Sequence, residues 1–370
     1  MDFKIYFVKN QTLAYICDIM SMINLNRNYL FNSDNLDFLN KFREELKGKI
    51  QLISIDPPYN TGKKMGKYKD SFNGMQSWLD FLKPRLELSK ELLTEDGLIF
   101  ININDKNAPY LRILCDTIFD IKNHLSTIVW QCKYTVSNDK QGISSQTESI
   151  LVYCKNPKKV IINNDPLDPE YAKVYKNWDN DPRGPWRKGV QLFKKKTKKV
   201  YTVESPTGVK WTKGWNYSEE EWYNTLVKEN LIYWGEKGDS CPTKKTFLGN
   251  SKGRGIRNLW LGQDVGYTQD GTKDLEDILK VEASFLYPKP VKLIKRIIEI
   301  ASRNDSVILD FFAGSGTLGQ AVLEYNRENP ESNRKFILVT NNESNICESI
   351  TKPRIKKVLS IGESFDYITL

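Results

Sequence analysis

The stretch SIDPPYNTG, residues 54–62, places an acid, two prolines and a tyrosine directly after an apolar run. A turn after a buried strand accounts for one proline and a glycine, but not for Asp56 and Tyr59. A carboxylate accepts hydrogen bonds, a proline carbonyl accepts without a competing N–H, and a tyrosine ring offers a face for stacking. Asp56 and Tyr59 are therefore candidate functional residues, because a turn does not require them.

A second candidate site lies in ILDFFAGSGTLGQAVLEYN, where an expected strand ends at Asp310, a glycine loop follows and a helix begins. Close backbone approach and helix N–H groups at such a turn suit a dinucleotide-like ligand. The loop is not of the Walker type, because no Gly-Lys-Thr/Ser follows it. As an isolated motif it is weak, and a tight turn without a ligand is the alternative.

An acid near the end of the next strand would hold the ribose hydroxyls of such a ligand. Glu343 lies a little beyond Val339, and Asn341 and Asn342 are nearer alternatives. An exposed glutamate at a strand end is also common without any ligand.

The elements that must position these residues alternate between strands and helices. Residues 1–48 are expected to be largely helical, with Ser33 or Asp34 as the N-cap of an amphipathic helix. Expected strands at 50–55, 98–103, 306–312 and 335–339 alternate with helices at 75–93, 107–119, 288–302, 318–326 and 351–359, and two further strand-like runs precede residue 155. This order predicts an α/β fold with a doubly wound, mostly parallel sheet.

Residues 156–280 interrupt this rhythm with Pro, Gly, Trp and Lys in short strand-like pieces. We expect three parts: residues 1–155 and 281–370 as the two halves of one α/β domain, and residues 156–280 as a domain inserted between them. A surplus equal to the net charge of +9 lies within Lys176–Arg257, which contains eighteen Lys and Arg but nine Asp and Glu. Seven of the nine tryptophans also lie within 156–280. Nucleic acid would need such basic and aromatic side chains, and a solvated basic face over a small aromatic core is the alternative.

Composition excludes several other classes. The chain has one histidine, His124, so a Ser-His-Asp hydrolase or a His-rich metal site would depend on it alone. The six cysteines are scattered singly, which argues against zinc and against a disulfide framework and fits a reducing cytoplasm. No apolar run is long enough to span a bilayer, and a signal peptide is not expected.

The two motifs together resemble the adenine-specific DNA methyltransferases that use S-adenosylmethionine. Their order, DPPY first and FAGSGT last with a variable region between, looks like the β group, which includes the modification subunits of type III restriction systems. NSDNLDFL, DPRGPW, LIYWGEKGDSCP, FLYPKPVKLIKRII and ILVTNNESNICESITKPRIKKVL also resemble segments of that family, so the likeness covers roughly residues 30–360. One departure is Thr147, which stands where family members often carry a histidine.

The resemblance implies a circularly permuted Rossmann-like methyltransferase fold with an inserted target-recognition domain. In such an enzyme, Asp56 and the Pro57 carbonyl would accept the two hydrogens of an adenine amine and aim its lone pair at a sulfonium methyl group. Tyr59 would stack on the base, and the adenine would be flipped out of the duplex. The catalytic residues implied are Asp56, Pro57, Pro58 and Tyr59, and no metal is required.

The resemblance also implies which residues hold S-adenosylmethionine. The glycine loop would wrap its methionine end, with Thr317 capping the helix, Glu343 or a neighbour on the ribose, and Lys289 on the floor of the site or facing water. The full set is Asp34, Asn35, Asp56, Lys289, Asp310, Phe312, Ala313, Gly314, Ser315, Gly316, Thr317 and Glu343.

Double-stranded DNA is the partner implied for the insertion, and a homodimer and a helicase-nuclease restriction subunit are possible further partners. The candidate phosphate contacts are Arg183, Arg187, Lys194, Lys195, Lys196, Lys198, Lys199, Lys252, Arg254 and Arg257. For the KKKTKK run at 194–199, a mobile solvated loop is the alternative.

Two other functions stay open. One is transfer to a cytosine amine or to RNA, although related cytosine-amine enzymes usually carry Ser where this chain carries Asp56. The other is a catalytically silent subunit that only recognises DNA, against which the intact DPPY and FAGSGT motifs argue.

Overall fold

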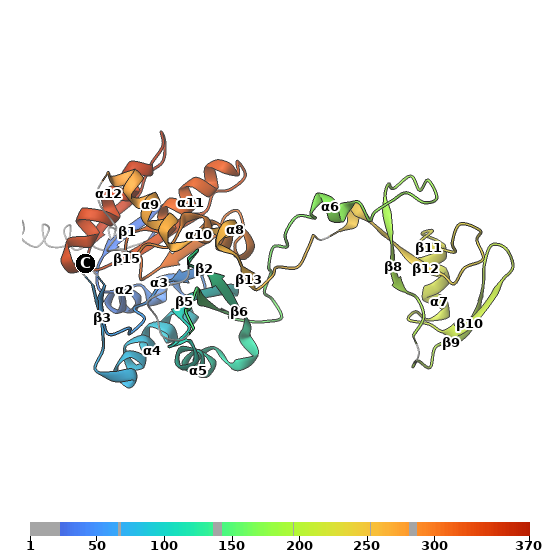
Figure 1. The fold of residues 1–370 in the computed structure, drawn as a ribbon, viewed down its shortest axis with the longest axis horizontal. Coiled ribbons are helices and arrows are strands. Elements are labelled where there is room, and N and C mark those ends of the chain that lie inside the picture. The colour runs from blue at the N-terminus through green and yellow to red at the C-terminus, as the bar shows by residue number, and fades with distance from the viewer. Residues whose placement is uncertain (1–22, 66–67, 136–142, 195, 252, 281–286) are drawn as a thin grey trace, which may run out of the picture. The chain divides into compact units, whose positions relative to one another are not determined.

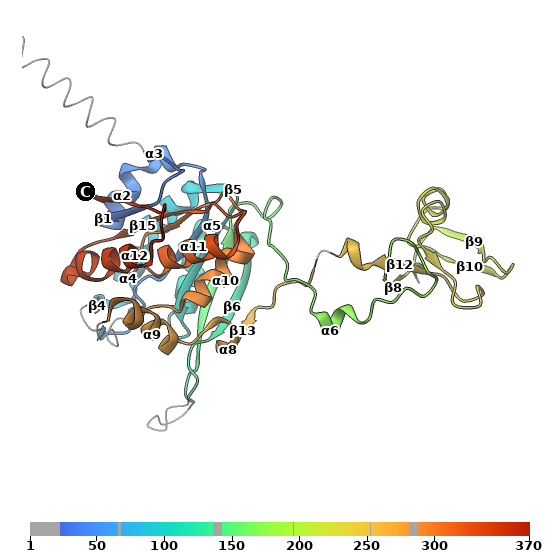
Figure 2. The ribbon, with the colours of Figure 1, turned by 90° about the horizontal axis from the view of Figure 1, so that it is seen from above.

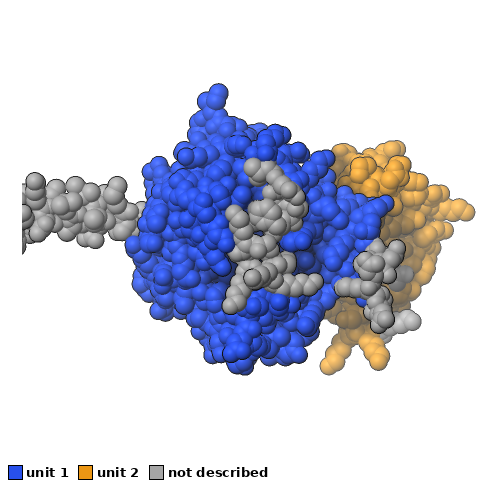
Figure 3. Space-filling view, turned by 60° about the vertical axis from the view of Figure 1, so that its left-hand side comes forward, with its two compact units in different colours: residues 1–163, 257–370 blue, residues 164–256 orange. Residues whose placement is uncertain are grey.

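The computed structural model describes residues 23–65, 68–135, 143–194, 196–251, 253–280 and 287–370. The chain divides into two compact units, which Figure 3 colours separately. Unit 1 combines the chain up to Asn163 with Arg257–Leu370, and unit 2 is Asn164–Ile256. The predicted helical character of residues 1–22 lies outside the described residues.

Unit 1 is built on one nine-stranded sheet with the order β13-β6-β7-β5-β2-β14-β15-β1-β16. The strands are β1 Tyr29–Asn32, β2 Ile50–Ile55, β5 Leu93–Asn104, β6 His124–Gln131, β7 Thr147–Cys154, β13 Leu259–Trp260, β14 Val307–Asp310, β15 Lys335–Thr340 and β16 Asp366–Thr369. All neighbours pair in parallel except β7, which is antiparallel to both β5 and β6. The predicted doubly wound, mostly parallel sheet is confirmed.

Helices cover both faces of this sheet (Figure 1 and Figure 2). One group is α2 Asn35–Lys41, α3 Arg43–Leu46, α4 Gly74–Leu92 and α5 Ala108–Phe119. The other is α8 Gly262–Val265, α9 Thr268–Leu279, α10 Val291–Ala301, α11 Thr317–Glu328 and α12 Lys352–Val358. The β2, β14 and β15 strands are buried along almost their whole length, as expected of strands covered on both faces.

Short elements complete unit 1. The β3 (Lys63–Met65) and β4 (Tyr68–Asp70) strands pair as a small antiparallel hairpin after the DPPY segment. The remaining single turns are η1 Ile121–Asn123, η4 Glu343–Asn345 and η5 Cys347–Thr351.

The N-terminal prediction is partly wrong. Residues 29–32, expected within a largely helical region, form β1, because Tyr-Leu-Phe-Asn pairs in parallel with β15 on one side and β16 on the other. Aromatic and apolar residues favour a strand when neighbouring strands supply the hydrogen bonds, and this pairing partner lies about 300 residues away in sequence. The helix that follows begins as expected, with Asp34 as its N-cap.

Unit 2 is a small β-rich body. The β8 (Trp186–Gln191), β11 (Ile232–Tyr233) and β12 (Thr243–Phe247) strands form an antiparallel sheet in the order β11-β12-β8. A second antiparallel pair joins β9 Val200–Glu204 with β10 Lys210–Gly214. The helical turns are α6 Pro169–Ala172, α7 Glu219–Glu221, η2 Trp222–Val227 and η3 Leu248–Asn250.

Tryptophans form much of the core of unit 2. Trp186, Trp215 and Trp222 are buried, and Trp211 and Trp234 pack against the same apolar groups. Five of the tryptophans that suggested base stacking therefore serve packing, as the small-aromatic-core alternative predicts.

The boundaries of unit 2 differ from the predicted insertion at 156–280. Residues 257–280 form β13, α8 and α9, which belong to unit 1. The reason is pairing and packing: β13 adds to the large sheet beside β6, and the Trp130 indole donates to the Gly266 carbonyl at 2.9 Å.

Candidate functional site

The two sequence motifs meet at the carboxyl ends of two neighbouring central strands of the large sheet. The β2 strand pairs in parallel with β14, with Leu52 opposite Ile308 and Ile53 opposite Leu309. Asp56 follows the carboxyl end of β2, and the glycine loop follows the carboxyl end of β14. Adjacent strands lie about 4.8 Å apart, so the two segments share one surface.

The strand order of the sheet reverses between β2 and β14. From β2 the chain continues through α4 to β5 on one side, whereas from β14 it continues through α11 to β15 on the other. In open α/β sheets, ligands bind outside the carboxyl ends of the strands at such a switch point. The topology therefore indicates the same site as the motifs.

The DPPY segment is held by hydrogen bonds to its backbone. The Asn102 amide donates to the Ile55 carbonyl at 3.1 Å, and the Trp78 indole donates to the Pro58 carbonyl at 2.7 Å. The Asn107 amide donates to the carbonyl of Tyr59. The Pro58 carbonyl is thus already engaged by Trp78.

The residues after Tyr59 are fixed by a second set of contacts. Asn60 adopts a positive φ of 54°, and the buried Asp70 carboxylate accepts the backbone N–H groups of Asn60 and Thr61 at 2.7 and 3.0 Å. Asn60 in turn accepts the Phe72 N–H at 3.1 Å. The loop beyond the motif is therefore closed onto the β3–β4 hairpin.

A cluster of ionisable groups surrounds Asp56. The Lys289 ammonium lies 2.7 Å from Asp56 Oδ2 and 3.7 Å from Glu148 Oε2, and the Tyr59 hydroxyl donates to Glu148 at 3.0 Å. Burial opposes the charge on Lys289, but Asp56 and Glu148 outweigh it and raise the pKa of Lys289. Burial, followed by the two carboxylates, raises the pKa of Tyr59 well above its usual value.

Lys289 does not face water, because only 11% of its side chain is exposed. This excludes the water-facing alternative. Its ion-pair partners in the structure are Asp56 and Glu148, so its predicted place on the floor of a cofactor site stays a prediction.

The glycine loop owes its shape to its glycines. Gly314 and Gly316 have φ values of 49° and 80°, which favour glycine. A Cβ on Gly319 would lie 2.6 Å from Ile355 and 2.9 Å from Leu338, so this glycine lets α11 approach α12 and β15. Together they have the spacing G-x-G-x-x-G, with one physical reason for each glycine.

A buried arginine holds this loop from beneath. The Arg354 guanidinium donates to Ser315 Oγ at 3.1 Å, to Thr317 Oγ1 at 2.9 Å and to Gln320 Oε1 at 2.8 Å. Burial lowers the pKa of Arg354 to about 10. The prediction that Thr317 caps the helix is wrong, because Gly316 is the N-cap of α11 and Thr317 already belongs to the helix.

Asp310 is the acid beneath the loop. Its carboxylate accepts the Phe312 N–H at 2.9 Å, and its residue is 8% exposed. Burial raises the pKa of Asp310 to about 8, and the charge of Asp56 acts in the same direction. An acid that is largely neutral below pH 8 is a functional-site candidate because a cationic ligand would ionise it.

Asp34 and Asn35 reach the same edge through β1, which pairs with β15. The Asn35 amide donates to the Phe311 carbonyl at 2.8 Å and accepts from Arg85 at 2.6 Å. Arg85 also lies 3.5 Å from Asp34 Oδ2. Glu343 lies beyond β15, the neighbour of β14, and its side chain is exposed.

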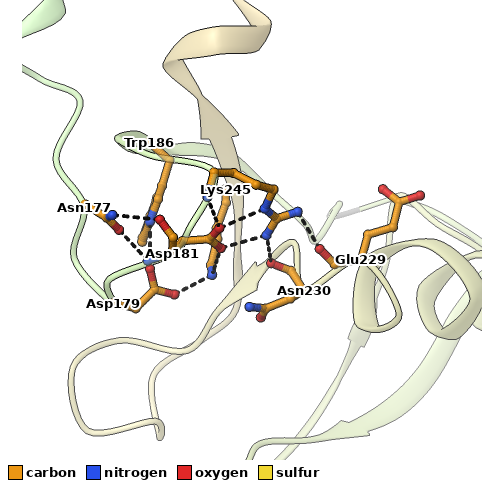
Figure 4. A network of polar contacts seen from close by, with 8 residues as sticks. Asn177, Asp179, Asp181, Trp186, Glu229, Asn230 and Lys245 are labelled. Carbon is orange, nitrogen blue, oxygen red and sulfur yellow. Dashed lines mark hydrogen bonds and ion pairs between the residues drawn. The ribbon is translucent and has the colours of Figure 1, made fainter.

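Several candidate DNA contacts in unit 2 have protein partners. Arg183 pairs with Asp181 at 2.7 Å and donates to the backbone carbonyls of Glu229 and Asn230 at 2.7 and 3.0 Å. Figure 4 shows this network, in which the buried Lys245 joins Asp181 at 3.0 Å and also pairs with Asp179. Arg183 therefore stabilises the fold of unit 2 and is also a candidate DNA contact.

The other candidate DNA contacts differ in whether their side chains have protein partners or are exposed. Arg187 donates to the Tyr171 hydroxyl at 2.6 Å, and Arg254 lies 3.7 Å from Asp168. Lys194, Lys196, Lys198, Lys199 and Arg257 are exposed, whereas Lys195 and Lys252 lie outside the described residues. Their role on DNA stays a prediction.

Neither a metal-binding group nor a membrane-spanning helix is found in the described ranges. Their His, Cys, Asp and Glu side chains do not gather in threes as metal ligands would. None of their helices combines the length and apolar character needed to cross a bilayer.

Comparison with known proteins identifies the family. The family model of the N6_N4_Mtase DNA methylases matches residues 50–352, which include both motifs, the β2–β14 pair and all of unit 2. The chain belongs to this DNA methylase family.

The chain is similar to proteins named as parts of both type III and type II systems. The Mod subunit of the type III restriction-modification enzyme StyLTI from Salmonella typhimurium is 32% identical, over 90% of this chain and 57% of that protein. The type II methyltransferase M.KpnI from Klebsiella pneumoniae is 27% identical, over 90% of this chain and 85% of that protein. The structure of the PvuII DNA methyltransferase (cytosine-N4-specific) aligns with a TM-score of 0.48 and 13% identity, over 91% of this chain and 88% of that one.

The chain spans 50–58% of the length of four type III Mod subunits that it matches. It spans most of M.KpnI.

Sequence reasoning missed three residues at the candidate site: Glu148, Arg85 and Arg354. Glu148 directly follows Thr147, the residue singled out as a departure from the family resemblance. No motif marks Glu148 itself. Arg85 and Arg354 are buried charges on helices, and helical sequence alone does not show which face turns toward a motif far away. The structure identifies these three residues by their hydrogen bonds to Tyr59, Asn35 and Ser315, respectively.

Proposed function

We propose that the chain transfers a methyl group from S-adenosyl-L-methionine to the N6 amine of an adenine flipped out of double-stranded DNA. The observation that carries the proposal is the parallel pairing of β2 with β14, which brings Asp56 and the glycine loop to one edge. Membership of the N6_N4 DNA methylase family supports transfer to an exocyclic amine. An aspartate at the first position of the motif favours adenine over cytosine.

The chemistry follows from the DPPY segment. The adenine amine is a poor nucleophile because its lone pair is delocalised into the ring. Asp56 and the Pro57 carbonyl accept its two hydrogens, which draws the lone pair out of conjugation and fixes its direction. As the nitrogen becomes cationic, the Asp56 carboxylate stabilises the new charge. Tyr59 presents its ring to the flipped base.

The residues of the second segment fit the cofactor. The positive φ values at Gly314 and Gly316 let the backbone curve closely around a ligand at the N-terminus of α11, which is twelve residues long. Asp310 provides a carboxylate for a cationic group beside it. When bound, S-adenosylmethionine supplies an electrophilic methyl group. The residues proposed to hold it are Asp34, Asn35, Asp310, Phe312, Ala313, Gly314, Ser315, Gly316, Thr317 and Glu343.

We assign DNA recognition to unit 2 and the segments that flank it, because the basic excess of the chain lies there. The exposed lysines Lys194, Lys196, Lys198 and Lys199 would contact phosphates, which makes affinity sensitive to salt. A homodimer and a restriction subunit are further proposed partners, supported by the Mod subunits among the relatives. The proposed place of action is the cytoplasm, which the scattered single cysteines fit.

The test is methyl incorporation into unmodified DNA by the purified chain, followed by digestion and mass spectrometry of the nucleosides. N6-methyldeoxyadenosine is the expected product. N4-methyldeoxycytidine would replace the adenine assignment, and methylation of RNA alone would replace the DNA assignment. Cofactor and DNA binding without any methylated nucleoside would identify a silent recognition subunit.

A further inference from the structure

Lys289 is shared between two carboxylates that come from different parts of the chain. Asp56 follows β2, Glu148 lies on β7, and Lys289 stands just before α10. The ammonium lies 2.7 Å from Asp56 and 3.7 Å from Glu148, and its side chain is 11% exposed. Glu148 is also tied to the motif itself, because it accepts the Tyr59 hydroxyl at 3.0 Å.

The two oxygens of Asp56 have different surroundings. Oδ2 pairs with Lys289. Oδ1 is buried and has no hydrogen-bond partner among the described residues. A buried carboxylate oxygen without a partner is costly, and an amine N–H of a bound base would satisfy it. Lys289 thus fixes which oxygen of Asp56 is left for the substrate.

The backbone around Lys289 is itself held in place. Lys289 lies between Pro288 and Pro290, which restrict the chain on either side. A Cβ on Gly271 of α9 would lie 2.1 Å from the Pro288 carbonyl oxygen, so only glycine allows this close approach. This support suits a side chain whose ammonium must stay at one point.

Three further ionisable groups lie next to Asp56, Glu148 and Lys289. They are Tyr59, Asp310 and Cys132. Burial raises the pKa of Cys132 to about 12, the pKa of Tyr59 lies well above its usual value, and the pKa of Asp310 is about 8. Tyr59 and Cys132 are therefore neutral, and Asp310 is largely neutral at pH 7.

We propose that Lys289 and Glu148 are a pair of positioning residues that keep Asp56 ionised and turn its Oδ1 toward the substrate amine. This inference rests on the proposed methyl transfer. Without a cation between them, two neighbouring carboxylates cannot both ionise freely, and one of them takes up a proton. A protonated Asp56 is a weaker acceptor for the amine and stabilises less of the positive charge that forms there.

The reaction balances without a further reactant. The carbon–sulfur bond of the donor breaks as the carbon–nitrogen bond forms, and the sulfonium becomes a neutral thioether. The methylated amine then releases one N–H proton to Asp56 or water. Lys289 and Glu148 exchange no proton in this sequence.

The test is the acid limb of kcat against pH at saturating cofactor and DNA, where it reports groups of the complex. Lys289→Gln should move this limb to higher pH by about one unit or more. Glu148→Gln should move it to lower pH, because Asp56 then has Lys289 to itself. The double variant should return to within about half a unit of the wild type, since it again holds one uncompensated carboxylate.

Two further variants make the result specific. Lys292→Gln removes an exposed lysine of α10, three residues after Lys289, and should leave the limb in place. Lys289→Arg keeps the charge and should leave the limb closer to the wild type than Lys289→Gln does. Binding of S-adenosylmethionine, measured by calorimetry, shows that each variant is folded and should change by less than about fivefold.

An acid limb that stays in place in both Lys289→Gln and Glu148→Gln would overturn the inference. Loss of cofactor binding in Lys289→Gln with an unmoved limb would overturn it too and return Lys289 to the floor of the cofactor site. If Lys289→Gln does not fold, the downward shift in Glu148→Gln decides alone, and no shift refutes the pair. Failure of the wild type to methylate DNA would refute the proposed function instead, which separates the two.

Discussion

Cofactor binding should depend on pH through Asp310. The carboxyl has a pKa of about 8 in the protein alone, mainly because it is buried. The cationic methionine end of the cofactor should bind the ionised form. At pH 6 about 1% of this carboxyl is ionised and at pH 8 about half, so the association constant should rise roughly 50-fold between them.

Calorimetric titration of the chain with S-adenosylmethionine at pH 6, 7 and 8 measures this rise. Asp310→Asn keeps the shape of the side chain without the charge and should show a weaker affinity at pH 8 with a much smaller dependence on pH. Any titration of the ligand itself is common to both proteins and cancels in the comparison. Asp305→Asn, which removes an exposed acid just before the same strand, should behave as the wild type. Equal affinity of the wild type at pH 6 and pH 8 would refute the reasoning.

The raised pKa of Asp310 also affects folding stability, which should fall as pH rises, whereas cofactor affinity should rise. An unfolded aspartate releases its proton near pH 3.9, whereas folded Asp310 keeps its proton to about pH 8. The folded state therefore binds more protons between these values, and its contribution to stability is lost as pH rises through this window. The cofactor should restore part of that loss near pH 8. A melting temperature of Asp310→Asn that falls with pH as steeply as the wild type would contradict this.

Four further predictions follow from individual contacts. Asp56→Ala should abolish methyl transfer and leave the dissociation constant of S-adenosylmethionine nearly unchanged, and equal loss of both would make Asp56 a structural residue. Gly271→Ala should destabilise by about 1–3 kcal/mol in urea unfolding, because its Cβ would overlap the Pro288 backbone carbonyl and this overlap exceeds the roughly 1 kcal/mol gain in helix propensity, whereas Gly249→Ala, with open space around it, should cost much less. Lys245→Met should destabilise unit 2 by about 1–3 kcal/mol in hydrogen exchange, since buried Asp181 keeps Arg183 but loses the hydrogen bond from the Lys245 ammonium, and unchanged protection would refute this. Neutralising the lysines of Lys194–Lys199 should flatten the salt dependence of DNA binding, and an unchanged slope would identify the run as a solvated loop.

The local elements were largely predictable from the sequence, because their signals are local. The buried strand at 50–55, the strand that ends at Asp310 and the helix after the glycine loop all occur within a few residues of their expected bounds. Their side-by-side position in the sheet was implied only by the resemblance, since β2 and β14 are about 250 residues apart in sequence. What joins them is sheet pairing, which no short pattern shows.

Contacts between distant side chains could not be predicted. Nothing near Lys289 in sequence shows that its ammonium reaches Asp56 and Glu148, because these residues meet only when three separate segments fold together. The role of the tryptophans was open for the same reason. Basic and aromatic composition fits both a nucleic-acid surface and a packed core, and burial of Trp215 and Trp222 decides for the core at those positions.

The central claim is that Asp56 and the glycine loop form one methyl-transfer site. A crystal structure of this chain with S-adenosylmethionine tests it most directly. We predict that the sulfonium lies over the carboxyl ends of β2 and β14, with its methyl group toward Asp56 Oδ1 and its methionine end against Gly314–Gly316. A cofactor bound elsewhere, or with its methyl group turned away from Asp56, would contradict the account.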